Sequence, residues 1–157
     1  MLSPAIGYAA AAMGYLASCP RTPLRAKDIA KAIGAPPAYL AKIVHALARK
    51  GYFRTRRGRG GGVILGTDPS QVTLYELCVA MNDDVIHLKC GLGHATCSLD
   101  RACPAHEAQQ SIRRIQLEFL RNTTITQVGE FVGCGAAGEA CRHPMREASG
   151  LSVGLTG

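Results

Sequence analysis

The sequence predicts a mostly α-helical fold with a small β wing: a winged helix-turn-helix followed by a long C-terminal dimerisation helix. Apolar residues recur at helical spacing through much of the chain. Two short helical segments are joined by a glycine turn, and a glycine-rich turn then connects two strand-like runs. The 157 residues leave room for one domain with an appendage, which excludes a large multidomain enzyme.

The first two helices are predicted from apolar spacing and from the residues that end them. Residues 4–17 are mostly alanine with a few larger apolar side chains, and the Cys19-Pro20 step ends this pattern. We expect this first helix to be mostly buried. Residues 26–33 place apolar side chains at helical spacing, and Gly34 then terminates a second, short helix.

A third helix is predicted directly after this turn. Pro36 and Pro37 suit its first turn, where a missing N–H costs nothing. Its inward stripe is predicted to be Tyr39, Leu40, Ile43, Val44 and Leu47. Its outward face is predicted to carry Ala38, Ala41, Lys42 and His45. Two helices joined by a tight turn, the second with small and basic outward residues, indicate a helix-turn-helix.

A β-hairpin is predicted next. Residues 52–56 resemble a strand, residues 57–62 read Arg-Gly-Arg-Gly-Gly-Gly, and residues 63–65 form a second apolar run. A phosphate-cradling loop is the alternative for these glycines, but such loops lead from a strand into a helix. We therefore favour a wing with a cationic tip, whose glycines allow close approach to a phosphate or a minor groove.

The second half of the chain is predicted to hold a short helix at 74–81 and a long helix that begins at Pro104. Residues 82–103 between them look irregular, and the Gly-rich residues 133–157 are expected to form a flexible tail. The apolar stripe of the long helix consists of Ile112, Ile115, Phe119 and Leu120. Because a chain this short cannot easily cover such a stripe, we expect a second copy of the chain to cover it.

Charge is distributed unevenly along the chain. Residues 1–67 hold eleven basic side chains and one acidic one, whereas residues 68–157 hold seven basic and ten acidic ones. Between Asp28 and Asp68 there is no carboxylate but there are eight bases. A basic block that coincides with a helix-turn-helix and a wing indicates a polyanion partner, and duplex DNA fits best.

Three cysteines and a histidine form the strongest candidate for a metal site. Cys90, Cys97, Cys103 and His106 are spaced as C-x6-C-x5-C-x2-H, and they can supply four ligands to zinc or to an iron-sulfur cluster. Long intervening loops favour a cluster over zinc. Because three cysteines lie within fourteen residues, zinc is in turn favoured over inert thiols or thiols with a purely redox role. Pro104 is expected to be the first residue of the long helix, with Cys103 at its N-cap and His106 one turn in.

The remaining cysteines carry weaker signals. Cys19 and Cys78 lie in apolar helical contexts and are expected to be core thiols, whereas Cys134 and Cys141 are expected to be free thiols, with metal ligation as the alternative. The odd total of seven cysteines argues against a disulfide framework. No secretion signal or membrane span is predicted, so we expect a cytoplasmic protein. No pair of a nucleophile and a base is evident, which argues against an enzyme.

Three features together resemble the Rrf-type bacterial transcription regulators, the family of IscR, NsrR and RirA. They are the Tyr39-Leu40 segment, the Arg-Gly-Arg-Gly-Gly-Gly wing from Arg57, and the cysteine loop that leads into a long helix. The resemblance covers about residues 1–130. It implies a homodimeric regulator that binds palindromic DNA and senses cluster status. The implied regions are 1–81 for DNA binding, 82–103 for cluster binding and 104–132 for dimerisation, and the Gly-rich composition of residues 133–157 predicts a flexible tail beyond them.

The resemblance also implies roles for individual residues. Cys103-Pro-Ala-His106 matches the Cys-x-x-His of IscR-like members, which implies a [2Fe-2S] rather than a [4Fe-4S] cluster. NsrR-like repressors, which respond to nitric oxide, take a carboxylate from the partner's first helix, and this first helix has none. Arg57 matches a wing arginine used in the minor groove. The candidate DNA-binding residues are Pro36, Ala38, Tyr39, Ala41, Lys42, His45, Arg54, Arg56, Arg57 and Arg59.

Four hypotheses follow from these patterns. The leading one is a transcription regulator that senses an iron-sulfur cluster or redox status. The alternatives are an NsrR-like nitric-oxide-sensing repressor and a DNA-binding module stapled by a structural zinc ion. A thiol-redox enzyme or cluster carrier with incidental basic charge is the remaining possibility from another class.

Overall fold

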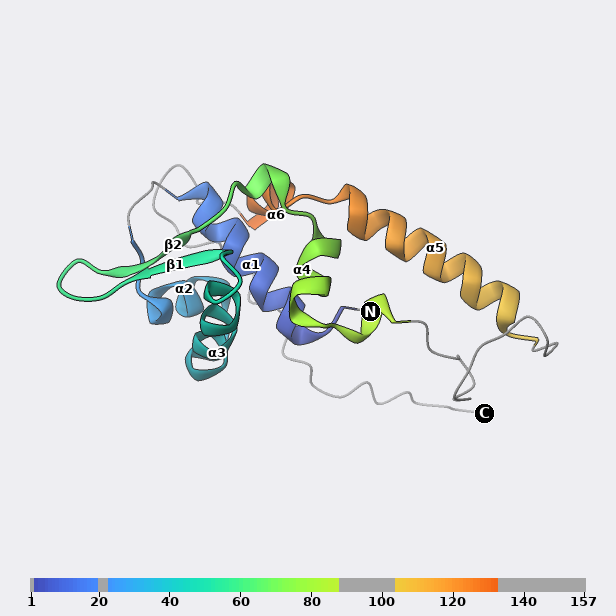
Figure 1. The fold of residues 1–157 in the computed structure, drawn as a ribbon, viewed down its shortest axis with the longest axis horizontal. Coiled ribbons are helices and arrows are strands. Elements are labelled where there is room, and N and C mark those ends of the chain that lie inside the picture. The colour runs from blue at the N-terminus through green and yellow to red at the C-terminus, as the bar shows by residue number, and fades with distance from the viewer. Residues whose placement is uncertain (1, 20–22, 88–103, 133–157) are drawn as a thin grey trace, which may run out of the picture.

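The computed structural model describes residues 2–19, 23–87 and 104–132. Helices dominate the fold, with one short hairpin (Figure 1). In chain order the elements are α1 (Pro4–Ser18), α2 (Ala26–Ile33), α3 (Pro37–Ala48), β1 (Phe53–Arg56), β2 (Gly62–Leu65), the 3-10 turn η1 (Pro69–Gln71), α4 (Leu74–Met81), the 3-10 turn η2 (Asp84–Ile86), α5 (His106–Asn122) and α6 (Ile125–Val132). The mostly α fold with a small β wing is therefore confirmed.

Helix α1 lies at the centre of the core, as its alanine-rich sequence predicted. Most of its residues are buried, and the Ser3 side chain caps its first turn. Small residues let α6 pack very closely against it. A Cβ on Gly14 would lie only 2.9 Å from the backbone nitrogen of Gly129, and the Ser18 hydroxyl donates a 2.8 Å hydrogen bond to the Gly129 carbonyl. Glycine at both positions is thus required by the crossing of two backbones.

Helices α2 and α3 form the predicted helix-turn-helix. Gly34 ends α2 in the left-handed conformation with φ of 69°, which glycine adopts without strain. The predicted inward stripe of α3 is confirmed for Leu40, Ile43, Val44 and Leu47, all of which are buried. Tyr39 differs from the prediction, because 40% of its side chain is exposed.

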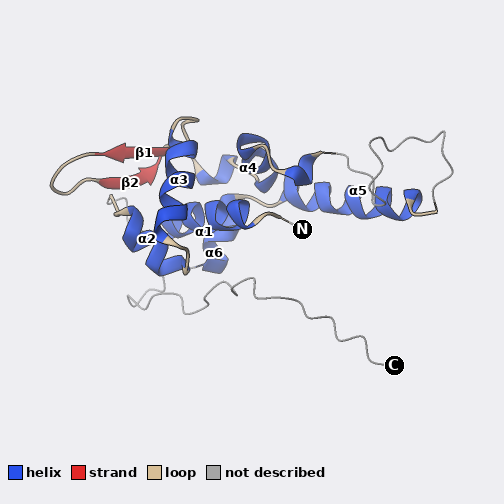
Figure 2. Cartoon of the chain, turned by 90° about the horizontal axis from the view of Figure 1, so that it is seen from below, coloured by secondary structure: helices blue, strands red, loops and turns tan. Residues whose placement is uncertain are grey.

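The predicted hairpin is present and extends from one end of the molecule (Figures 1 and 2). Strands β1 and β2 pair antiparallel, with Phe53 opposite Leu65 and Arg56 opposite Gly62. At the base of the hairpin, the Val63 backbone exchanges two hydrogen bonds with Leu24, of 2.7 and 3.1 Å. The hairpin is thereby fixed to the segment that precedes α2.

Helix α4 begins and ends where the sequence predicted. Thr73 and Glu76 form a reciprocal capping box at its start, and Asn82 ends it in the left-handed conformation with φ of 52°. Asp83 follows and is the one buried charged residue among those described. Its carboxylate accepts hydrogen bonds from the Ser3 hydroxyl and from the backbone N–H of Val85. The start of α1 is thereby connected to η2.

The long helix α5 begins later than predicted. Its N-cap is Ala105, whose carbonyl accepts the first helical hydrogen bond from the Gln109 N–H at 3.0 Å. His106 is therefore the first helical residue, and the predicted N-cap position of Cys103 is wrong because the helical hydrogen bonds start two residues further on. In both views α5 extends away from the wing (Figures 1 and 2).

A separate helix, α6, follows α5 after a break at Thr123 and Thr124, which the sequence pattern did not separate from the long helix. Thr124 and Gln127 form hydrogen bonds that cap the start of α6. The Thr123 carbonyl and the Ile125 N–H bond to the backbones of Leu74 and Val72 at 2.9 and 2.8 Å. These contacts turn the chain so that α6 returns to α1.

Two cysteines lie in the described part of the chain. Cys78 is a fully buried free thiol, as predicted. Cys19 is only half-buried at the end of α1 and is disulfide-bonded, so its prediction as a core thiol is wrong. Cys134 and Cys141 lie outside the described residues. Within those residues, no helix has both the length and the apolar character needed to cross a membrane.

Candidate nucleic-acid interface

One face of α3 is fully available to a partner. Ala38, Ala41, Lys42 and His45 are exposed, as the sequence predicted, while the opposite face of the helix packs into the core. Pro36 is exposed at the N-cap, and Pro37 occupies the first turn. The exposed face therefore changes along the helix, from apolar at the N-terminal end to basic at the C-terminal end, where Arg49 is also exposed.

The wing carries the second part of this surface. Phe53 is the one buried residue of β1 and fixes the strand to the core, whereas Arg54 and Arg56 are exposed. Arg57 and Arg59 are exposed in the turn. Gly58 and Gly60 have φ of 97° and 80°, so the turn needs a residue that adopts the left-handed region without strain. A tight turn with arginines around it can approach a phosphate backbone closely.

The helix and the wing lie at the same end of the molecule. Strand β1 follows α3 almost directly, and in Figures 1 and 2 the hairpin extends beside α2 and α3. No carboxylate occurs in the sequence between Asp28 and Asp68. Helix α3 and the wing themselves therefore carry basic side chains and no acidic ones, and a polyanion would be attracted to them.

Helix α5 presents an apolar stripe at the other end of the molecule. Ile112, Ile115 and Phe119 are 60%, 65% and 53% exposed. They recur at spacings of three and four residues and therefore share one side of the helix. Leu120, which was predicted to belong to this stripe, is instead fully buried in its own chain. The exposed stripe is consequently free to contact another molecule.

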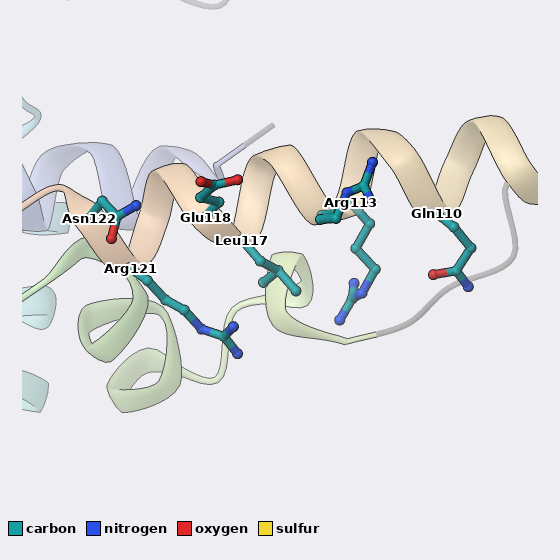
Figure 3. A pocket seen from close by; sticks show the side chains of 7 residues that line it. Gln110, Arg113, Leu117, Glu118, Arg121 and Asn122 are labelled. Carbon is teal, nitrogen blue, oxygen red and sulfur yellow. The ribbon is translucent and has the colours of Figure 1, made fainter.

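A second side of α5 is polar and connects the helix to the core. Arg113 donates hydrogen bonds of 2.8 and 2.9 Å to the carbonyls of Ile86 and His87, at the end of η2. Arg121 lies over the ring of Tyr75, 4.8 Å from its centroid. Figure 3 shows Arg113, Leu117 and Arg121 projecting from α5 around an open hollow of about 370 Å³ that α5 residues line.

Neither of these arginine roles was found from the sequence. The sequence places Arg113 and Arg121 off the apolar stripe of the long helix and indicates no partner for either of them. A guanidinium that bonds to carbonyls 26 and 27 positions away leaves no local sequence pattern, because its acceptors are backbone atoms. The capping of α6 is different, since Thr124 and Gln127 have the Thr-x-x-Gln spacing that marks a helix start.

The candidate cluster ligands are only partly placed. His106 is half-buried and is the first residue of α5. Cys90, Cys97 and Cys103 lie outside the described residues. In the described ranges there is no group of three or more cysteine, histidine or carboxylate side chains that could hold a metal ion. Of the four candidate ligands, only His106 therefore lies in the part of the chain that the structure describes.

The chain matches one protein-family model over most of its length. The Rrf2 model, described as an iron-dependent transcriptional regulator, matches residues 2–130. Among curated proteins, the chain is similar to the HTH-type transcriptional regulator NsrR of Geobacillus kaustophilus, with 31% identity, covering 57% of this chain and 64% of that protein. It is similar to the regulator IscR of Klebsiella pneumoniae, with 29% identity, covering 68% of this chain and 64% of IscR.

Solved structures give the same fold. CymR, the global cysteine regulator of B. subtilis, superimposes with a TM-score of 0.68 at 21% identity, covering 83% of this chain and 97% of CymR. At this level of identity the likeness supports the arrangement of the helices and the wing. It assigns no ligand to either chain.

Proposed function

Because the chain belongs to the Rrf2 family of transcriptional regulators, we propose that it binds palindromic operator DNA as a homodimer and senses an iron-sulfur cluster through Cys90, Cys97, Cys103 and His106. Its relatives and structural neighbours are regulators rather than enzymes. A regulator of this kind acts on chromosomal DNA, which is cytoplasmic in bacteria. The observation that carries the DNA-binding part is the joint exposure of α3 and the cationic wing at one end of the molecule.

In this proposal α3 enters the major groove and the wing reaches the neighbouring minor groove. A recognition helix usually contacts base edges through residues near its N-terminus, where Ala38 and Ala41 are exposed. Arg57 and Arg59 at the wing tip then lie where a narrow, negatively charged minor groove attracts arginine. Arg54, Arg56, Lys42 and His45 supply further contacts to phosphates or bases, and Pro36 and Tyr39 flank them.

The homodimer is supported by the apolar stripe of α5. Ile112, Ile115 and Phe119 together expose a large apolar surface that a monomer would leave in water. Pairing with the same stripe of a second chain covers both copies at once, as a two-fold interface requires. A two-fold dimer presents two recognition helices to half-sites about one helical turn, roughly 34 Å, apart. Operator palindromy follows from that symmetry.

The cluster is supported by the chemistry of the donor set. Three thiolates and an imidazole are suitable ligands for an iron-sulfur cluster. The match of Cys103-Pro-Ala-His106 to the Cys-x-x-His of IscR-like regulators favours a [2Fe-2S] cluster. His106 at the first position of α5 is close to the positive end of that helix, which favours anionic groups nearby. Helix α1 contains no carboxylate, which supports an IscR-like rather than an NsrR-like ligand set. When bound, the cluster supplies a group that responds to iron supply and oxidants.

The proposed functional regions are the four that the sequence predicts. Residues 1–81 bind DNA, residues 82–103 bind the cluster, residues 104–132 carry the dimer interface and residues 133–157 form a tail.

For sensing, the cluster must change the free energy of DNA binding. A group that binds two conformations with equal affinity does not shift the equilibrium between them. Arg113 provides a route for this coupling, since it connects α5 to η2, which precedes the first candidate ligand, Cys90, along the chain.

Anaerobic purification followed by a visible spectrum, metal analysis and DNA titration tests the proposal. We expect coloured protein with iron and sulfide, and a difference in operator affinity between the cluster-loaded and cluster-free forms. Alanine at Cys90, Cys97 or Cys103 should bleach the protein, and His106→Cys should retain colour with a shifted potential. Colourless protein with stoichiometric zinc would instead support a structural zinc module, and equal DNA affinity of both forms would refute sensing.

A further inference from the structure

We propose that α3 reads its half-site through thymine methyl groups, which Ala38 and Ala41 contact in the major groove, next to a guanine that Lys42 contacts. This inference rests on the proposed function, because it requires α3 to enter the major groove. It adds the class of base sequence that the helix selects.

The position of the two alanines carries the first step. Ala38 and Ala41 are exposed, lie three residues apart and therefore share one side of α3. Three residues correspond to about 4.5 Å along the helix axis, and stacked base pairs are about 3.4 Å apart. The two methyl groups can therefore reach neighbouring base pairs in the groove.

The N-terminal end of α3 also offers few hydrogen-bond donors. Pro36 is the N-cap, Pro37 follows it in the first turn, and no side chain caps the helix. Proline has no backbone N–H, so two donors that a helix start would otherwise present are missing. The part of α3 that should lie deepest in the groove is therefore apolar.

The side chains that usually read adenine and cytosine are missing from this part of the chain. Adenine is normally read by asparagine or glutamine, and the cytosine amino group by a carboxylate. The sequence from residue 29 to residue 67 contains neither amide nor acidic side chains. In the major groove, the thymine C5-methyl is the apolar group that an alanine can contact, and guanine O6 and N7 are acceptors for a lysine.

Lys42 is placed to make that second contact. It is exposed, adjacent to Ala41, and further along the helix from the apolar end. Small side chains at positions 38 and 41 bring the helix backbone nearer to the bases, which places the Lys42 ammonium within reach of a base edge. The geometry thus combines two apolar readers, Ala38 and Ala41, with the cationic Lys42 in one short stretch of the helix.

The test begins with a selection of random duplexes by the full-length wild-type protein, in each of its cluster states. If no sequence is enriched in either state, the proposed DNA-reading function fails, and with it this inference. If half-sites are enriched, each thymine in them is replaced by deoxyuridine, which removes only the C5-methyl group. We expect about fourfold weaker binding for each contacted methyl, from the transfer free energy of one buried carbon.

Matched controls separate base reading from general DNA affinity. Deoxyuridine at thymines outside the half-sites should leave the affinity unchanged, and Arg57→Ala should weaken thymine and uracil duplexes by the same factor. Ala38→Gly or Ala41→Gly should abolish the thymine-uracil difference at one position each. Replacing the half-site guanine by 7-deazaguanine should weaken wild-type binding but not that of Lys42→Met.

The deoxyuridine measurement uses wild-type protein, so it does not depend on whether the glycine variants fold. Sequence-selective binding that is indifferent to deoxyuridine at every half-site thymine would overturn the proposal while leaving the DNA-binding function intact. Retention of the thymine-uracil difference in both folded glycine variants would also overturn it.

Discussion

The rings of Tyr8 and Tyr39 meet edge to face, with centroids 5.9 Å apart and planes inclined by 78°. Tyr8 belongs to the central helix α1 and Tyr39 to the recognition helix α3. The pair explains why Tyr39 is neither buried nor free: part of its ring packs against α1 while 40% of the side chain remains exposed. An aromatic contact between α1 and α3 thus lies at the edge of the candidate DNA-binding face.

A double-mutant cycle should measure this contact. We expect Tyr8→Leu and Tyr39→Leu to lower the free energy of unfolding by amounts that are not additive, with a coupling of about 0.5–1.5 kcal/mol. Urea unfolding at one protein concentration provides the measurement. Tyr39→Phe keeps the ring and should retain the coupling. Strict additivity of the two leucine substitutions would show that the ring contact does not stabilise the fold.

Removal of the wing arginine should weaken DNA binding in a salt-dependent way. Arg57→Ala should lower the affinity for duplex DNA and reduce the slope of log affinity against log salt by about 0.9 for each lost phosphate contact. Arg114, which is exposed on α5 and away from the wing, provides the matched control. If Arg57→Ala and Arg114→Ala have the same small effect, the wing does not contact DNA.

A charge in the apolar stripe of α5 should prevent dimerisation. Ile115→Asp would bury an unpaired carboxylate in the proposed interface, at a cost of several kcal/mol. We expect a monomer in sedimentation experiments at concentrations where the wild type is a dimer. Gln110→Asp adds the same charge on an exposed position outside the stripe and should leave the dimer intact. A monomeric wild type would contradict the interface altogether.

Loss of the Arg113 hydrogen bonds should loosen α5. Arg113→Met keeps much of the side-chain length but removes the donors to the carbonyls of Ile86 and His87. Hydrogen bonds to a charged group contribute roughly 1.5–3 kcal/mol, so we expect a loss of stability in that range. Arg114→Met is the neighbouring control and should have little effect. Equal unfolding free energies for the two variants would disprove the role of Arg113.

The buried thiol of Cys78 should make stability fall at high pH. Burial raises its pKa from 9.0 to about 11, and the nearby Asp83 carboxylate adds to the shift. Because the unfolded thiol ionises first, the stabilisation is complete below pH 9 and is lost as the pH rises from 9 to 11, by on the order of 2 kcal/mol. Cys78→Ala should remove that part of the pH dependence. Parallel curves for both proteins over this range would contradict the shift.

Local signals were sufficient for most of the fold. The bounds of α2 and α4 agree with the prediction because glycine, asparagine and capping residues mark their ends. The outward face of α3 agrees because its period is well defined. The same period puts Tyr39 near the core. In the structure its ring instead packs edge to face against Tyr8, and part of the side chain remains exposed.

The errors in the second half of the chain have different causes. The start of α5 was placed too early because Pro104 is compatible with a first helical turn, and compatibility does not determine where the hydrogen bonds begin. The break before α6 was missed although its Thr-x-x-Gln signal is present in the sequence. In the first half, the disulfide bond of Cys19 has no local sequence signal, because disulfide pairing is a property of the tertiary fold. The cluster site and the DNA contacts stay predictions.

The lack of carboxylates from residue 29 to residue 67 also affects how fast such a protein finds its target. Because α3 and the wing themselves carry no carboxylate, the proposed function implies that any stretch of duplex attracts them and that long-range attraction steers association. Molecules held in this way slide and hop along the chromosome instead of diffusing freely. In the proposed function the search then becomes largely one-dimensional, and the base contacts proposed for α3 determine where it stops.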